Sequence, residues 1–240
     1  MEVEQVKRFY KDVSVAEDAG GWKVELDGRA IKTQGGNPQV VTSKTLAHAL
    51  AQEWAEQGEK IDARAFLFRD MADFAIDVVR PDRAATIDKL LGYAETDTLC
   101  YRADPEDALY QRQQEQWEPL VARLEETHGV RFQRISGVMH RPQPPETLAA
   151  LRAHLETLDD FVLSGMVSMA SLAASLGIAL LANDEAINDP MMLWRDANLE
   201  EEWQADQWGR EEEAEERRQQ RGEDFSAAQV FVMLAQSGTL

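Results

Sequence analysis

Residues 161–182 read FVLSGMVSMASLAASLGIALLA, a run of 22 residues without a charged side chain. Its apolar positions recur at helical spacing, and the opposite face is apolar or small as well. A helix that is apolar on every side has to be buried. The length also suits a membrane span, but Asp159–Asp160 precede the run, Asn183–Glu185 follow it, and no Lys or Arg beside either end would set an orientation. We therefore predict the buried central helix of a soluble domain.

The first 62 residues show a different pattern from the rest of the 240-residue chain. Trp22, Val24 and Leu26 alternate with polar residues as in a strand, and Asp27-Gly28 is typical of a hairpin turn. One helix is expected from Ser43 to Gly58, followed by a connector at 59–65. We predict an α+β protein, in which a small antiparallel β-rich N-terminal domain (1–62) with one helix precedes a larger all-helical C-terminal domain (63–240).

The C-terminal part is expected to be a series of helices packed around the buried run. The predicted helices lie at 66–79, from Pro81 to Ala94, at 104–128, at 146–158, from a cap at Asp184 or Asn188 into the acidic stretch near the C-terminus, and at 225–234.

The chain is strongly acidic, with 44 Asp and Glu against 25 Lys and Arg and a net charge of −19. This charge disfavours nucleic acids and anionic membrane surfaces as partners. A single cysteine, Cys100, excludes an internal disulfide. The N-terminus has neither an apolar run nor the character of a transit peptide. We therefore expect a cytoplasmic bacterial protein that is not inserted in a membrane and is monomeric when free.

Motifs for cofactors and metals are absent from the sequence. The four histidines are far apart, and neither a P-loop nor a dinucleotide-binding glycine loop is present, so no cofactor and no metal are expected. Cys100 is interpreted as a packed thiol rather than a nucleophile. Asp70, Asp73 and Asp77 share a helix face, which leaves a hydrolase or lyase acting in an interdomain cleft as the alternative function.

Two tryptophans lie among acids in the segment 199–209, LEEEWQADQWG. In a helix, Trp203 and Trp208 would point about 140° apart. The segment is therefore either a solvated amphipathic helix that ends at Gly209 or a binding surface, because aromatic residues beside charged ones suit recognition.

The chain resembles the Atp12-type assembly chaperones of the F1 sector of ATP synthase. The resemblance runs in order from about residue 8 to 215 and is carried by RFYKDV at 8–13, LDGRAIKT at 26–33, TDTLCYR at 96–102, QWEPL at 116–120, and EWQ and QWG at 202–204 and 207–209. Phe9-Tyr10 departs from the family's usual Phe-Trp, and Asp70, Asp73 and Phe74 depart from its usual run in that region.

The resemblance implies a chaperone without enzymatic activity, whose client is the free α subunit of F1. The chaperone would cover the subunit interface of α until the β subunit takes its place. The partner-binding residues that the resemblance implies are Glu201, Glu202, Trp203, Gln204, Trp208, Gly209 and Glu212. It does not distinguish Glu201 from Glu202 as the key acid.

Overall fold

The computed structural model describes residues 6–137, 139–184 and 189–237. Contacts divide the chain into two compact units. Unit 1 comprises residues 1–83, 159–165 and 230–240, and unit 2 comprises 84–158 and 166–229. The helix that follows the first connector is thus counted with the sheet, whereas the sequence placed a boundary at residue 62. The division into domains at residue 62 stays a prediction.

Unit 1 contains the small antiparallel sheet that the alternating pattern predicts. The strands are β1 (Val13–Asp18), β2 (Gly21–Leu26), β3 (Arg29–Ala30) and β4 (Val40–Val41). Strand β2 pairs with all three others, and its register with β1 runs from Val13 opposite Leu26 to Asp18 opposite Gly21. Asp27 and Gly28 have φ angles of 49° and 75°, which forms the tight turn predicted before β3.

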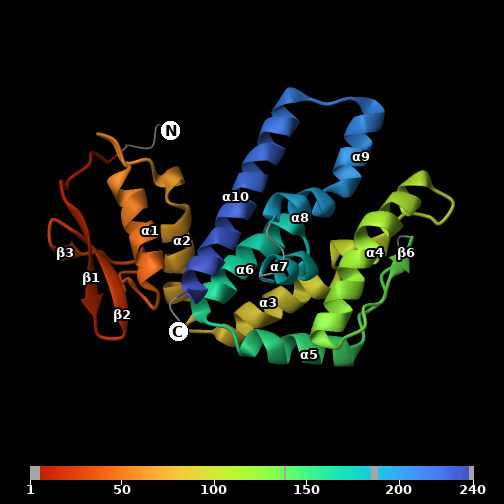
Figure 1. Ribbon diagram of the computed structural model, residues 1–240, viewed down its shortest axis with the longest axis horizontal. Coiled ribbons are helices and arrows are strands. Elements are labelled where there is room, and N and C mark those ends of the chain that lie inside the picture. The colour runs from red at the N-terminus through yellow and green to blue at the C-terminus, as the bar shows by residue number, and fades with distance from the viewer. Residues whose placement is uncertain (1–5, 138, 185–188, 238–240) are drawn as a thin grey trace. The chain divides into compact units, whose positions relative to one another are not determined.

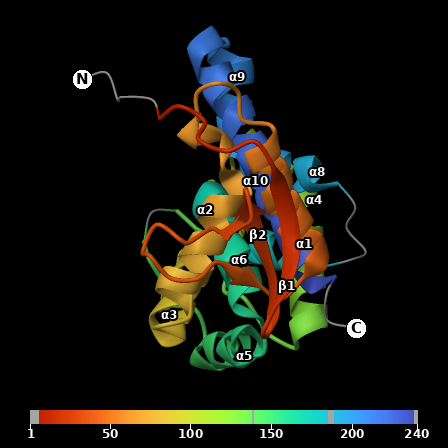
Figure 2. The same cartoon turned by 90° about the vertical axis from the view of Figure 1, so that its left-hand side faces the viewer.

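Helix α1 (Lys44–Ala55) packs against this sheet (Figure 2). The Ser43 side chain accepts a hydrogen bond from the Leu46 amide and caps the helix as predicted. Leu46 and Leu50 are at most 1% exposed and form part of the core under the sheet. The small antiparallel N-terminal sheet of the predicted fold class is therefore confirmed.

Unit 1 also contains helical segments that follow the sheet and α1 or come from the end of the chain. After a short turn at Ala63–Ala65, α2 (Leu67–Phe74) continues as a π-helical turn at Ala75–Val79. The sequence predicts a helix here but not the wider turn. At the other end of the chain, Phe231 lies with its ring centroid 6.1 Å from that of Phe68. This contact is the apolar docking expected of the terminal helix.

The C-terminal part is helical apart from one short pair of strands (Figure 1). Its helices are α3 (Arg83–Glu95), α4 (Ala108–His128), α5 (Pro145–Glu156), α6 (Asp160–Ala173), α7 (Leu176–Ala182), α8 (Pro190–Ala197), α9 (Leu199–Trp208) and α10 (Glu212–Gln236). Strands β5 (Tyr101–Arg102) and β6 (Ile135–Ser136) pair in parallel. The α+β class is confirmed, with this parallel pair as an addition to the expected helices.

The uncharged run 161–182 is buried as predicted, but the prediction of one continuous helix is wrong. Ala174 has a φ of 48°, and Ser175 is extended and caps α7 by accepting from the Ile178 amide. The buried carboxylate of Asp97 accepts from the Ser175 hydroxyl at 2.6 Å and from the Gly177 amide at 2.8 Å. These contacts with a residue far away in sequence stabilise the break. Among the described residues, no helix combines the length and the apolar character needed to cross a membrane.

The segment after residue 188 also differs from its prediction. Asp189 caps α8, whereas Asn188 lies outside the described residues. The predicted continuation into the acidic stretch is interrupted at Asn198, where α9 begins as a separate helix. The predicted short helix at 225–234 is the end of the 25-residue helix α10.

Candidate protein-binding surface

Helix α9 separates the predicted binding residues into two faces. Glu201, Gln204 and Trp208 are exposed and lie at i, i+3 and i+7, which places them along one side of the helix. We call these three residues the α9 stripe. Trp208 is 83% exposed, whereas Trp203 is partly buried. The sequence prediction that the two tryptophans point in different directions is consistent with this difference.

Glu202 lies on the other face and forms ion pairs within the protein. Its carboxylate contacts Arg210 at 2.8 Å and Arg218 of α10 at 2.7 Å. Arg210 also contacts Asp206 at 2.8 Å and Glu215 at 3.2 Å. The side-chain hydrogen bonds of Asp206 and Glu202 raise the pKa of the exposed Arg210 guanidinium. The Glu202 carboxylate is thus engaged in ion pairs that connect α9 with the turn and with α10.

Gly209 connects these two helices at an angle that other residues adopt with strain. Its φ is 101°, and its amide donates to the Ala205 carbonyl at the end of α9. Glu212 is exposed and is the first residue of α10. Its negative charge at the helix N-terminus stabilises the helix. The predicted residues therefore form one helix–turn–helix segment within unit 2, which Figure 1 shows as α9, the turn and the start of α10.

A shallow hollow of about 310 Å³ lies beside this segment. Its lining comprises Arg112, Gln116, Met192, Arg195, Asp196, Leu199, Glu202 and Asp206. Burial raises the pKa of Asp196 to about 6. Met192 is 41% exposed and adds apolar surface. A mixed lining of this kind suits another protein surface better than a small apolar ligand.

The carboxylates considered for the alternative enzyme are engaged with a loop in unit 1. Asp77 accepts hydrogen bonds at 2.8 Å from the Thr33 hydroxyl, the Gly35 amide and the Asn37 side chain. Asp73 accepts from the Gln34 amide at 3.0 Å and from the Gln39 side chain at 2.6 Å. These acids hold the loop 33–39 in place, so their helical spacing has a structural explanation.

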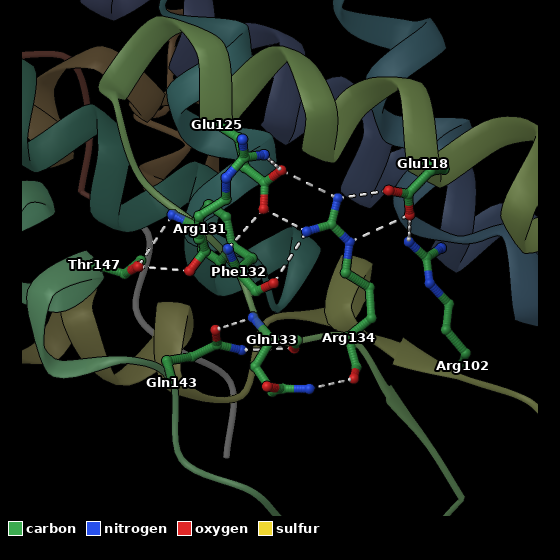
Figure 3. A network of polar contacts seen from close by, with 9 residues as sticks. All are labelled: Arg102, Glu118, Glu125, Arg131, Phe132, Gln133, Arg134, Gln143 and Thr147. Carbon is green, nitrogen blue, oxygen red and sulfur yellow. Dashed lines mark hydrogen bonds and ion pairs between the residues drawn. The ribbon is translucent and has the colours of Figure 1, made fainter.

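Arg102 and Glu118, which lie in motifs that carry the family resemblance, belong to a partly buried charge network in unit 2 (Figure 3). Arg102, with a side chain only 1% exposed, donates to Glu118 at 3.2 Å and to the Gln113 carbonyl. Arg134 bridges Glu118, at 2.6 Å, and Glu125. Because a buried charge needs a partner, the buried Arg102 and Glu125 depend on the more exposed Glu118 and Arg134. These motif residues therefore stabilise unit 2.

Glu125 is the other acidic centre of this network. It also accepts from the Phe132 amide at 2.8 Å and pairs with Arg131 at 2.9 Å. Burial acts to raise the pKa of Glu125, but the hydrogen bonds from Arg134 and Phe132 outweigh it and lower the pKa. The sequence analysis missed Glu125 and Arg134, as well as Arg210 and Arg218, because their partners lie on other elements.

Cys100 is 1% exposed, and burial raises the pKa of its thiol far above the ordinary value. A thiol in this state is a poor nucleophile, in agreement with its interpretation as a packing residue. Within the ranges that the structure describes, no group of three His, Cys, Asp or Glu side chains could hold a metal ion.

Comparisons with known proteins agree with this architecture. The family model described as ATP12 chaperone protein matches residues 7–125. The crystal structure of Atp12 from Paracoccus denitrificans is 34% identical, covers 95% of this chain and 98% of its own, and superposes with a TM-score of 0.89. The Atu1473 protein from Agrobacterium tumefaciens is 36% identical, covers 95% of this chain and 85% of its own, and has a TM-score of 0.90. The mitochondrial atp12 protein of Schizosaccharomyces pombe is 24% identical over 222 residues, which are 88% of this chain and 76% of the relative.

Shared sequence and shared fold along nearly the whole length place this protein in the class of chaperones. The chain belongs to the ATP12 chaperone family. The resemblance found in the sequence is thereby confirmed.

Proposed function

We propose that this protein binds the free α subunit of the F1 sector of ATP synthase and covers its subunit interface until the β subunit takes that place. An unassembled subunit exposes a large interface, which is prone to aggregation. The family membership supports a role in ATP synthase assembly.

The single observation that carries the assignment of the site is the exposure of Trp208 beside Glu201 and Gln204. A tryptophan that is 83% exposed costs solubility unless a partner covers it, and aromatic side chains often dominate binding energy at interfaces. The neighbouring acids would meet basic side chains of the client and accelerate association. The α9 stripe is accordingly the proposed centre of contact, with Trp203, Gly209 and Glu212 supporting it.

The ion pairs of Glu202 suggest different roles for the two adjacent acids. Glu201 is 55% exposed at its side chain and lies 3.7 Å from Arg218, whereas Glu202 pairs closely with two arginines. We infer that Glu201 faces the client and that Glu202 fixes the geometry of the turn. Glu201→Lys and Glu202→Lys should both weaken capture of the client, but only Glu202→Lys should also loosen the connection between α9 and α10.

Co-expression of the α subunit with this protein tests the proposal. We expect soluble α only when the chaperone is present, and the two should co-purify. Trp208→Ala should weaken capture by about tenfold or more, the range of an interface hot spot. The matched control is Gln207→Ala, an exposed neighbour outside the stripe. Equal solubility of α with and without the chaperone would refute the proposed client. Unchanged capture by Trp208→Ala and Glu201→Lys would instead remove the α9 stripe from the site.

The state and location of the free protein remain proposals as well. We expect a monomer, which light scattering of the purified chain tests, and a cytoplasmic location, which fractionation of cells tests. A stable dimer would require a revised account of which surfaces are available to a client.

A further inference from the structure

A second surface with the character of a protein-binding site lies in unit 1, away from α9 in sequence. It is a groove of about 590 Å³, and the residues used in the argument are Phe9, Tyr10, Trp54, Asp27, Arg29 and Lys32. We call it the N-terminal groove. Nothing in the proposed role of α9 accounts for it.

The walls of the N-terminal groove are fixed by hydrogen bonds. The Tyr10 hydroxyl donates to the Trp54 carbonyl at 2.6 Å. The amides of Lys11 and Asp12 donate to the same Asp27 carboxylate oxygen at 3.0 and 2.8 Å. The segment before β1 is thus held both to α1 and to the turn before β3. A preformed groove binds with a smaller entropic cost than one that must form on contact.

An aromatic side chain stands exposed at this groove. Phe9 is 67% exposed, and its ring packs edge-on against Tyr10 at 5.3 Å between centroids. Tyr10 in turn packs against Trp54 at 5.6 Å. The buried Tyr10 holds Phe9 in position, so an apolar side chain of a partner would meet a supported aromatic surface.

The charge of the N-terminal groove is opposite to that of the whole chain. Arg29 and Lys32 are both exposed, and in the described ranges neither lies within ion-pair distance of a carboxylate. The amides of Asp12 and Lys11 lower the pKa of Asp27, which stays ionised and offsets one of the two cations. In a protein with a net charge of −19, a cationic groove selects an acidic partner.

We propose that the N-terminal groove is a second protein-binding site, which takes an extended acidic segment carrying an apolar or aromatic side chain from another polypeptide. The apolar side chain packs against Phe9 and Tyr10, and flanking carboxylates pair with Arg29 and Lys32. The site is complementary to the α9 stripe, which selects basic surface. It does not depend on which subunit the α9 stripe binds.

A labelled synthetic peptide in which glutamate alternates with leucine and phenylalanine provides the test, with fluorescence anisotropy on the full chain as the readout. We expect saturable binding that weakens with salt. Arg29→Glu together with Lys32→Glu should weaken binding by about tenfold or more, because two exposed attractions become repulsions. Phe9→Ser should also weaken it. All three side chains are exposed, so the fold should be retained, as circular dichroism checks.

The matched control is Lys89→Glu with Arg141→Glu, which changes the net charge equally at two exposed sites outside the groove. This control should bind the peptide like the unchanged protein. Equal weakening by the control would reduce the effect to net charge and overturn the proposal. Binding of a lysine-for-glutamate version of the peptide, or full competition by inorganic phosphate, would also overturn it. Failure to capture the α subunit would affect only the proposed function.

Discussion

The Arg218 guanidinium of α10 lies 2.7 Å from the Glu202 carboxylate of α9, sixteen residues earlier in the chain. Arg218 also contacts Glu215 at 3.0 Å and is only 14% exposed at its side chain. The pair therefore connects two helices, and water screens it less than the other ion pairs of this segment. The acidic stretch is thus partly neutralised by its own arginines. Within the α9 stripe, Glu201 lies 3.7 Å from Arg218, while Gln204 and Trp208 are exposed.

Replacing Arg218 tests whether this pair orders the segment. Arg218→Met removes the cation that Glu201, Glu202 and Glu215 share. We therefore expect a loss of about 1 kcal/mol in the free energy of unfolding and faster hydrogen exchange in α9. Arg217→Met is the control, because Arg217 is 64% exposed and, among the residues that the structure describes, forms an ion pair only with Glu213. Equal exchange rates in the two variants would argue against an ordering role for Arg218.

Alanine in place of glycine should change stability in opposite directions at Gly209 and Gly92. Gly209→Ala forces a side chain onto a residue with a φ of 101°, and we expect a loss of about 1–3 kcal/mol in local or global stability. Gly92→Ala should do the opposite, because Gly92 lies in α3 with open space around its Cα and an alanine there lowers the entropy of the unfolded chain. Thermal unfolding of both variants measures the contrast, and a stabilised Gly209→Ala variant would contradict the geometry.

Asp97 predicts a pH dependence. Burial raises its pKa to about 6, while donors such as Ser175 and Gly177 act to lower it. The folded state therefore binds the proton more tightly than the unfolded state. The stability that this provides is complete below the unfolded pKa and is lost as the pH rises through about 6.

Asp97→Asn removes this titration and serves as the comparison. The stability advantage of the unchanged protein over the variant should shrink by about 1 kcal/mol between roughly pH 5.5 and pH 8. Urea unfolding at several pH values measures it. An advantage that grows with pH would show that the hydrogen bonds to Asp97 outweigh its burial.

Replacing the carboxylates of α2 and the following turn should change the stability of the protein and no catalytic activity. Asp77→Asn should cost about 1–3 kcal/mol of stability, since the loop 33–39 loses a charged acceptor of three hydrogen bonds. Asp70→Asn should cost less, because Asp70 is exposed. Urea unfolding compares them. A saturable conversion of a metabolite that Asp77→Asn abolishes would revive the alternative of a hydrolase or lyase.

The sequence alone determined the α+β class, the sheet, most helices and the burial of residues 161–182, because these depend on periodicity and on local caps and turns. It also determined which seven residues to examine near the C-terminus. It could not determine the break at Ala174, since the Asp97 carboxylate that stabilises the break comes from a distant segment.

Only the tertiary structure decided which acids near the C-terminus form close ion pairs within the protein and which stay exposed. Helical spacing orders Glu201 and Glu202 around one helix, but it does not say which of them pairs closely with Arg218, at 2.7 Å for Glu202 against 3.7 Å for Glu201. That choice depends on Gly209, which turns the chain so that Arg218 reaches Glu202 and leaves Trp208 exposed. Ion pairs between elements depend on distance in space, and sequence separation does not encode that distance.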